Sequence, residues 1–283
     1  MAHETILHFK DGPYSILAIN LVCIFSAYFF LGLIFIFLYK RVLPALCVSY
    51  ITSEPVDRFY WTLRVVKIIG GTHCVAVSIW GTLADEALAK DVALASTLTS
   101  NVVLSITVGY FLLEFSADLV LRFKFDRKGF WVSFHHILCV LTYFEVVFSG
   151  KGHYYAVRLV MMECILPLQS ISWILHKSGL QHTRMWKANS LLLVKAYNAR
   201  TWIEVSTMFS VVGNFDVIVK KTPVYVVVLR LMFLITSMFA LTPYWTHLMT
   251  KRVYNELYNI DISKRTRGEM GDVMKKAVKF HQE

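Results

Sequence analysis

Long apolar runs, separated by short polar segments, dominate the chain. The clearest run is the uncharged stretch 15–39. It is long enough to cross a bilayer, because a spanning helix needs about 20 apolar residues. Six further runs have similar lengths but carry a few charges. The pattern predicts an all-α membrane protein with about seven transmembrane helices, at 15–39, 61–83, 92–117, 129–148, 152–176, 186–212 and 223–249.

Basic residues are divided unevenly between the segments that join these spans. One set of alternate segments, which includes the C-terminal tail, holds 18 Lys and Arg, whereas the other set holds 5. Lys and Arg accumulate in cytosolic loops. The first set is therefore expected in the cytosol, with the N-terminus lumenal and the C-terminus cytosolic.

Composition agrees with a membrane location and narrows the choice of partners. Charged residues make up 17% of the sequence, against roughly a quarter in soluble domains, so disordered and coiled-coil proteins are excluded. The net charge of +10 favours membrane lipids with anionic headgroups, or anionic substrates. No nucleic-acid-binding motif accompanies this charge, so nucleic acid is not expected as a partner. The five cysteines lack metal-ligand or disulfide spacing, so we expect no metal and interpret them as small buried side chains.

Charged and imidazole side chains inside the predicted spans are the most informative feature. A charge at the bilayer centre costs about 2.5–3.5 kcal/mol, so such residues normally face a bundle interior or a wet cavity. Basic residues outnumber acidic ones here, which favours an anionic ligand such as a phosphate or a CoA headgroup. The spans contain Arg64, Lys67, His73, Glu114, His135, His136, Glu145, Arg158, Glu163, Lys195, Arg200, Glu204 and Arg230.

Local partners divide these residues into groups. Arg64 and Lys67 lie near the cytosolic end of their span, where we expect both to reach the headgroups. Asp118 shares a helix face with Glu114 and is expected at the water boundary. Arg200 and Glu204 are four residues apart and can neutralise each other. The candidate substrate-binding residues, with ion pairs across helices as the alternative, are Arg158, Lys195, Arg200 and Arg230.

Two adjacent histidines, His135 and His136, are the sharpest local signal. They follow Lys128 by about eight residues, or roughly 12 Å of helix, which places them in the cytosolic half of the membrane. Neutral imidazole can act as a nucleophile or a general base near neutral pH. Neighbouring helix positions point about 100° apart, so the pair is not expected to hold one metal ion. A hydrogen-bonded packing role is the alternative for both residues.

Several short motifs occur in an order that is typical of one family. They are WTLRVVKIIGGTHCVAVSIWGTLADEALAKD at 61–91, HH at 135–136, GHYYA at 152–156, ECILPLQSISWILHKSGL at 163–180, WKAN at 186–189 and TPYWTH at 242–247. With these motifs the chain resembles the TLC family, named for TRAM, Lag and CLN proteins, and most of all its endoplasmic-reticulum ceroid-lipofuscinosis branch. The likeness divides the chain into an N-terminal transmembrane helix and cytosolic loop (1–54), a TLC domain (55–258) and a basic cytosolic tail (259–283).

The resemblance implies a TLC-type helical barrel in the endoplasmic-reticulum membrane that transfers acyl chains from acyl-CoA, its co-substrate. By likeness to ceramide synthases, His135 would take the acyl group and His136 would assist, and the reverse assignment stays open. Glu163 would orient a histidine or hold a proton, with an ion pair to an arginine as the alternative. The chain lacks the His-Asp pair of ceramide synthases on the following span. The acceptor is therefore expected to be a glycerophosphodiester or lysophospholipid, in support of lysosomal lipid homeostasis.

A second function stays open beside this one. The resemblance also implies a cargo receptor that carries lysosomal enzymes from the endoplasmic reticulum to the Golgi and cycles through the intermediate compartment. The longest predicted lumenal loops are only about 84–91 and 213–222, and such short loops favour the enzyme. An enzyme would need its histidines, whereas a receptor would tolerate their loss.

Overall fold

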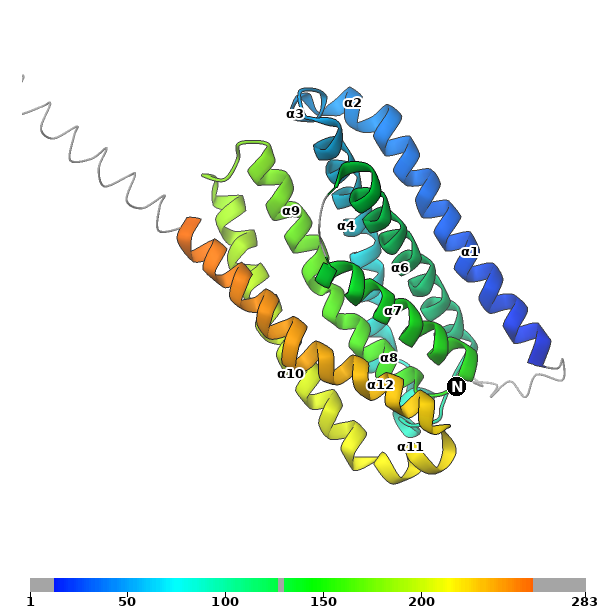
Figure 1. Cartoon of the computed structure of the whole chain (residues 1–283). Helices are drawn as coiled ribbons and strands as arrows, with labels where there is room; N and C mark the ends of the chain where they lie inside the picture. Colours follow the sequence, from blue (N-terminus) through cyan, green and yellow to red (C-terminus); the bar gives the residue numbers. More distant parts are fainter. Residues whose placement is uncertain (1–12, 127–129, 257–283) are drawn as a thin grey trace, which may run out of the picture.

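The computed structural model describes residues 13–126 and 130–256, which are helical almost throughout and contain no strand. Six helical segments in this part of the chain are long and apolar enough to cross a membrane, or seven if one bent pair is counted as a span. The prediction of an all-α membrane protein with about seven spans is therefore confirmed (Figure 1). The N-terminal residues 1–12 and the predicted basic tail at 259–283 lie outside the described residues.

Long helices alternate with short helices and irregular turns. The bent pair consists of α10 and α11, whose axes differ by 69°. The last span continues from α12 as far as Glu256. The helices are α1 (Pro13–Phe37), α2 (Leu43–Leu46), α3 (Val48–Ile51), α4 (Pro55–Leu83), α5 (Glu86–Lys90), α6 (Leu98–Phe125), α7 (Phe130–Ser149), α8 (His153–Val160), α9 (Ile165–Lys177), α10 (Arg184–Gly213), α11 (Phe215–Lys221) and α12 (Val224–Thr236). The turns are the π-helical η1 (Leu38–Val42) and η3 (Ser237–Leu241) and the 3₁₀-helical η2 (Met161–Cys164).

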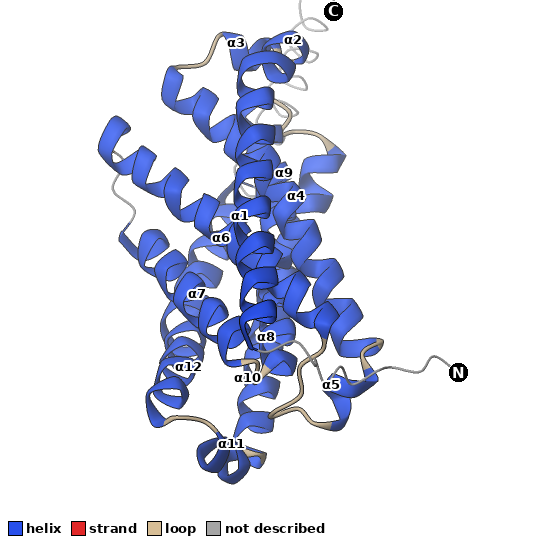
Figure 2. Cartoon of the chain, turned by 90° about the vertical axis from the view of Figure 1, so that its right-hand side faces the viewer, coloured by secondary structure: helices blue, strands red, loops and turns tan. Residues whose placement is uncertain are grey.

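Six spans form a closed ring, and one helix lies outside it. Around the ring, α4 contacts α6, α6 contacts α7, α7 contacts the α12 span, and that span contacts α10. The ring closes because α10 packs on α8 and α9, which pack on α4. Helix α1 lies outside the ring and packs chiefly along α6 (Figures 1 and 2). The interior of this helical barrel is where polar side chains can be kept away from lipid.

Helix α1 is attached to the ring by close backbone packing and one buried amide. Gly109 on α6 lets the helices approach, since a side chain there would meet the carbonyl oxygen of Ile24 and the Cβ of Ala27. The amide of Asn20 is buried, donates to the carbonyl oxygen of Val147 at 3.3 Å and accepts from Ser105 at 3.3 Å. Small residues and interhelical hydrogen bonds are the usual means of joining membrane helices.

Helix α6 differs from the predicted third span at both ends. It begins after Thr97, which forms a capping box with Ser100, and ends where Asp126 takes a left-handed conformation with φ 49°. The helix therefore runs from 98 to 125 rather than from 92 to 117. Its extra turns hold Asp118 within the helix, where the side chain is only 11% exposed. Asp118 is therefore a mostly buried residue of the helix, and its position at the water boundary stays a prediction.

The fifth span is continuous in length but changes its helical winding in the middle. The 3₁₀ turn η2 separates α8 from α9 and carries Glu163. Pro167 follows and has no N–H to bond back to the carbonyl of Glu163, which explains the local departure from α-helical pairing. Gly71 of α4 accommodates the proline ring, because a Cβ at 71 would lie 2.6 Å from Pro167 Cδ. The irregular turn thus presents Glu163 to the ring interior.

Candidate functional site

His136 lies between two carboxylates of α6. Its Nε2 is 2.8 Å from Oε2 of Glu114, and its Nδ1 is 2.7 Å from Oδ2 of Asp118. Neutral imidazole has only one N–H. If both carboxyl groups are ionised, both contacts are hydrogen bonds only when the ring carries two protons. The contacts therefore fit an imidazolium held between two carboxylates.

A lysine and a tyrosine complete the surroundings of Glu114. Lys67 on α4 places its Nζ 3.4 Å from Glu114 Oε2, and the Tyr110 hydroxyl donates to the other carboxylate oxygen. The positive charges of Lys67 and protonated His136 balance the carboxylates of Glu114 and Asp118. We call these four charged residues the charge network. Because Lys67 is only 11% exposed and faces a buried carboxylate, the expectation that it reaches the headgroups is wrong.

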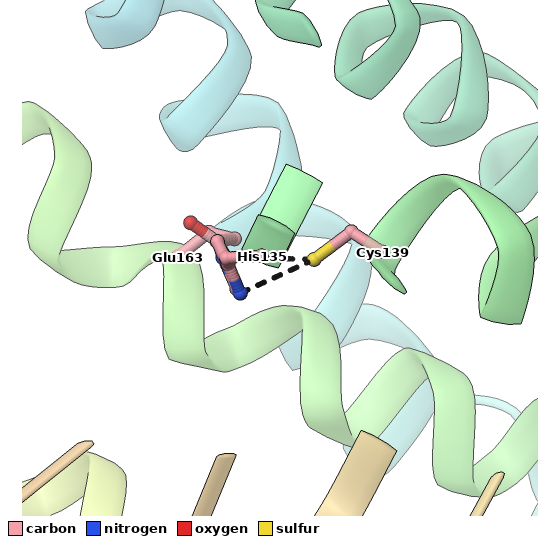
Figure 3. Close-up of side chains that lie close together, drawn as sticks. All are labelled: His135, Cys139 and Glu163. Atoms are coloured by element: carbon pink, nitrogen blue, oxygen red, sulfur yellow. Dashed lines mark hydrogen bonds and ion pairs between the residues drawn. The ribbon is translucent and has the colours of Figure 1, made fainter. Parts of the chain in front are cut away.

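His135 has different surroundings from its neighbour. Its Nε2 is 3.8 Å from Oε1 of Glu163, which is too long for an N–H···O hydrogen bond. Its ring nitrogens are 3.6 and 3.7 Å from Sγ of Cys139 (Figure 3), and the indole of Trp245 meets the ring edge-on at a centroid distance of 5.1 Å. Within the described chain, no oxygen holds either nitrogen of His135 at ordinary hydrogen-bond distance, although the residue is buried. The hydrogen-bond partner of the ring is the thiol of Cys139, which is a weak donor, so a neutral ring at this position is only weakly engaged.

Arg200 and Glu204 form a fully buried pair on α10, as their spacing predicts. Arg200 Nε is 3.5 Å from Glu204 Oε1, and both residues are 0% exposed. The same carboxylate oxygen accepts hydrogen bonds from Ser237 at 2.6 Å and Thr242 at 2.7 Å, both on the last span. The guanidinium also lies over the ring of Trp245, 5.5 Å from its centroid. Trp245 therefore connects this pair to the histidine site.

The other three candidate substrate-binding residues have separate surroundings. Arg230 forms a bidentate ion pair with Glu145, at 2.7 and 3.2 Å. For Arg230 the structure thus shows the ion pair across helices that was the alternative to substrate binding. Arg158 is half-buried and donates to the hydroxyl of Ser206 at 2.8 Å, and no carboxylate pairs with it among the described residues. Lys195 is exposed on α10.

A partly open apolar cavity lies in the half of the ring that ends at α11. Thr142 lines it, and the hydroxyl of this residue is buried without a hydrogen-bond partner in the described chain. Other lining residues on the ring helices include Leu159, Thr207 and Leu234. Thr142 lies about two helical turns from His135 on α7. The other three lie about one turn from a buried polar residue on the same span: Leu159 from Glu163, Thr207 from Glu204 and Leu234 from Ser237. The cavity therefore begins close to the histidine site.

Sequence reasoning found the histidines and Glu163 but missed Lys67, Asp118 and Trp245 as their surroundings. One signal was available, since Glu114 and Asp118 are four apart and share one helix face. The spacing does not predict which helix packs against the face that carries Glu114 and Asp118. The chemistry of the assembled site is that of a buried imidazole beside a carboxylate, which can act as a nucleophile or a base.

Comparison with known proteins agrees with this architecture. A family profile described as the TLC domain matches residues 60–251. Protein CLN8 of Canis lupus familiaris is 25% identical over 200 residues, which cover 70% of this chain and 69% of that protein. Protein CLN8 of Homo sapiens is 23% identical over the same length, with 70% of each chain covered. The matched region contains the whole ring apart from its outermost residues, and the chain belongs to the TLC domain family.

Proposed function

We propose that this protein is an endoplasmic-reticulum acyltransferase that moves an acyl chain from acyl-CoA to a glycerophosphodiester or lysophospholipid, in support of lysosomal lipid homeostasis. The observation that carries the proposal is the contrast between the two adjacent histidines. His136 has both nitrogens engaged by carboxylates and no lone pair to offer. His135 has only the weak thiol donor of Cys139 as a hydrogen-bond partner, and the carboxylate of Glu163 lies 3.8 Å from its Nε2. His135 is therefore assigned as the nucleophile, and His136 as the charged group that fixes α7 against α6.

The reaction assigned to His135 has two halves. Nδ1 attacks the thioester carbonyl, an N–C bond forms, the C–S bond breaks, and the proton on Nε2 moves to Glu163. The CoA thiolate leaves and takes a proton from solvent. In the second half, an acceptor hydroxyl attacks the acyl-imidazole, the C–N bond breaks, and Glu163 returns its proton to Nε2 while the hydroxyl proton goes to solvent. Catalytic contacts are often long before substrate binds, which is consistent with the 3.8 Å separation.

The apolar cavity supports an acyl substrate. Long acyl chains need an apolar space, and the apolar cavity begins at Thr142, about two helical turns from His135 on the same helix. The residues between His135 and Thr142 make less than two turns of α7. The chain would then extend toward the α11 end while the CoA headgroup remains at the other end, which the distribution of Lys and Arg predicts to be cytosolic.

The phosphate of the acceptor needs a positive partner that is not already neutralised. Arg200 and Arg230 face Glu204 and Glu145, and Lys195 points away from the ring interior. Arg158 bonds only to the hydroxyls of Tyr154 and Ser206 among its described contacts. It is therefore the first choice for the acceptor phosphate.

The test uses purified full-length protein in detergent with radiolabelled oleoyl-CoA. We expect CoA release and a covalent acyl adduct that mass spectrometry places on His135. The variant His135→Ala should lose both signals, whereas His182→Ala, which changes an exposed histidine in the loop before α10, should keep them. Cys139→Ser shows whether a neighbouring thiol carries the acyl group instead.

Two outcomes would reject the proposal. An adduct that survives His135→Ala but is lost in Cys139→Ser would overturn the assignment of the nucleophile. Absence of both adduct and CoA release, with each class of acceptor supplied, would overturn the enzyme and favour the cargo receptor. The receptor would then be tested by export of lysosomal enzymes in cells that carry His135→Ala.

A further inference from the structure

Arg64 is a half-buried arginine without an acidic partner, at the end of the ring that the distribution of Lys and Arg predicts to be cytosolic. Its guanidinium lies over the indole of Trp173 on α9, 5.9 Å from the ring centroid. Within the described chain, no carboxylate pairs with this guanidinium and no residue accepts a hydrogen bond from its five N–H donors. The carboxylate whose charge acts on it most, Glu114, is already bonded to Lys67 and His136. The guanidinium therefore lacks a counter-ion of its own.

The side chain of Arg64 is directed into the ring. It lies within electrostatic range of Tyr197 on α10 and of Arg252 on the last span. Neither helix is a main partner of α4, which packs on α6, α8 and α9. Tyr197 is buried and also lies within electrostatic range of Arg200 and Glu163. Tyr197 is therefore near both Arg64 and the histidine site.

Aromatic side chains fix the position of this guanidinium. Trp61 meets the indole of Trp173 edge-on, with the ring centroids 5.4 Å apart and an angle of 77° between the planes. A second cation, Lys177, lies 5.7 Å from the centroid of the same indole and is neutralised by Asp57 at 2.8 Å. Of the two cations at this ring, only Lys177 has an acidic partner. An anion that entered here would be the missing counter-ion, and a guanidinium can hold a phosphate through two parallel hydrogen bonds.

The separation along the fifth span matches the length of one part of acyl-CoA. Trp173 follows Glu163 by ten residues, which is roughly 15 Å of helix. In CoA, about 13 bonds join the thiol sulfur to the first phosphorus, and an extended chain advances roughly 3.3–3.6 Å for every three bonds, so this arm also spans roughly 15 Å. A thioester held at His135 and Glu163 would therefore place the first phosphate of CoA at the level of Arg64.

We propose that Arg64, supported by Trp173, binds the first phosphate of acyl-CoA and so sets the position of the thioester at His135. The identity of the ligand rests on the proposed function, whereas the anion site rests on the unpaired guanidinium. The alternative ligand is the phosphate of a lipid headgroup, as expected from the position of Arg64 in the sequence, but it would not explain why the guanidinium faces the ring interior. Arg64 should contribute to the affinity for acyl-CoA and not to the rate of acyl transfer, because the phosphate takes no part in bond making at the thioester.

The binding test compares two ligands that differ only in the phosphate. They are the oleyl thioethers of 4′-phosphopantetheine and of pantetheine, which have no carbonyl for His135 to attack. Their binding to purified full-length protein in detergent is measured by competition with the radiolabelled oleyl thioether of CoA. We expect the wild type to prefer the phosphate compound by about 10–100-fold, the usual contribution of hydrogen bonds to a charged group. Arg64→Gln should remove most of this preference, and Arg64→Lys, which keeps the charge but not the planar fork, should keep part of it.

A matched variant and an added lipid make this test decisive. Arg184→Gln removes the same charge from an exposed arginine at the start of α10 and should keep the preference of the wild type. Addition of phosphatidic acid to the micelles should leave binding of the phosphate compound unchanged, and displacement by this lipid would identify a headgroup site instead. An equal preference in wild type and Arg64→Gln, or no preference in wild type, would also overturn the CoA phosphate site.

The acyl-adduct assay separates this inference from the proposed function. With oleoyl-CoA, Arg64→Gln should raise the half-saturating concentration by about 10–100-fold and leave the maximal rate of adduct formation unchanged. Adduct formation by Arg64→Gln with the half-saturating concentration of the wild type would overturn the role of Arg64 and leave the enzyme standing. A phosphate preference that depends on Arg64, without any adduct in wild type, would reject the proposed function and leave the anion site standing.

Discussion

Removal of the positive charge at Lys67 should destabilise the protein strongly. The charge network balances two positive and two negative charges, and Lys67→Met leaves one buried carboxylate uncompensated. Lys67 Nζ is 3.4 Å from Glu114, whose side chain is only 2% exposed. Loss of one partner from a buried ion pair costs about 3–5 kcal/mol. At roughly 2–4 °C per kcal/mol, the melting temperature in detergent should fall by about 6–20 °C.

A compensating change tests the charge balance directly. The double variant Lys67→Met with Glu114→Gln removes one charge of each sign and leaves His136 paired with Asp118. It should therefore recover at least half of the fall in melting temperature. Lys90→Met is the matched control, because the Lys90 side chain is 77% exposed and its ion pair contributes little. The reasoning would be refuted if Lys67→Met had the melting temperature of the wild type, or if the double variant had a lower melting temperature than Lys67→Met.

Two further predictions concern the packing of the helices. Gly109→Ala should lower the melting temperature by several degrees, because its Cβ would meet the carbonyl oxygen of Ile24 and overpacking costs about 1–3 kcal/mol; Gly213→Ala, which meets nothing within 4 Å, should melt with the wild type. Glu145→Gln should cost about 1.5–3 kcal/mol by weakening the charged hydrogen bonds of Arg230. Adding Arg230→Gln to Glu145→Gln should restore part of this loss in the same melting assay, and a further fall would contradict the ion-pair explanation.

The sequence predicted the spans well because each apolar run is long and bounded by polar residues. It predicted both ends of α6 poorly, and the start of that helix depends on the capping box of Thr97 rather than on hydrophobicity. The residue types of the charge network were all visible within or beside the predicted spans. Their assembly was not, because Lys67 and His136 lie on helices that contact Glu114 from different sides.

The candidate site shows the same limit in another way. The adjacent histidines were recognised as one motif, yet the structure gives them unlike surroundings. His136 is held by two carboxylates of α6, whereas His135 faces Glu163 on an irregular turn. Adjacent helix positions must diverge, so the divergence was predictable. The identity of the facing helices depends on the closure of the ring, which no local pattern contains.

The buried amide of Asn20 has a consequence for how the protein is made. Asn20 is synthesised before its partners Ser105 and Val147, which follow 85 and 127 residues later. Until α6 and α7 are synthesised, this polar group has no protein partner, which is unfavourable in hydrocarbon. Docking of α1 therefore belongs to a late stage of membrane insertion.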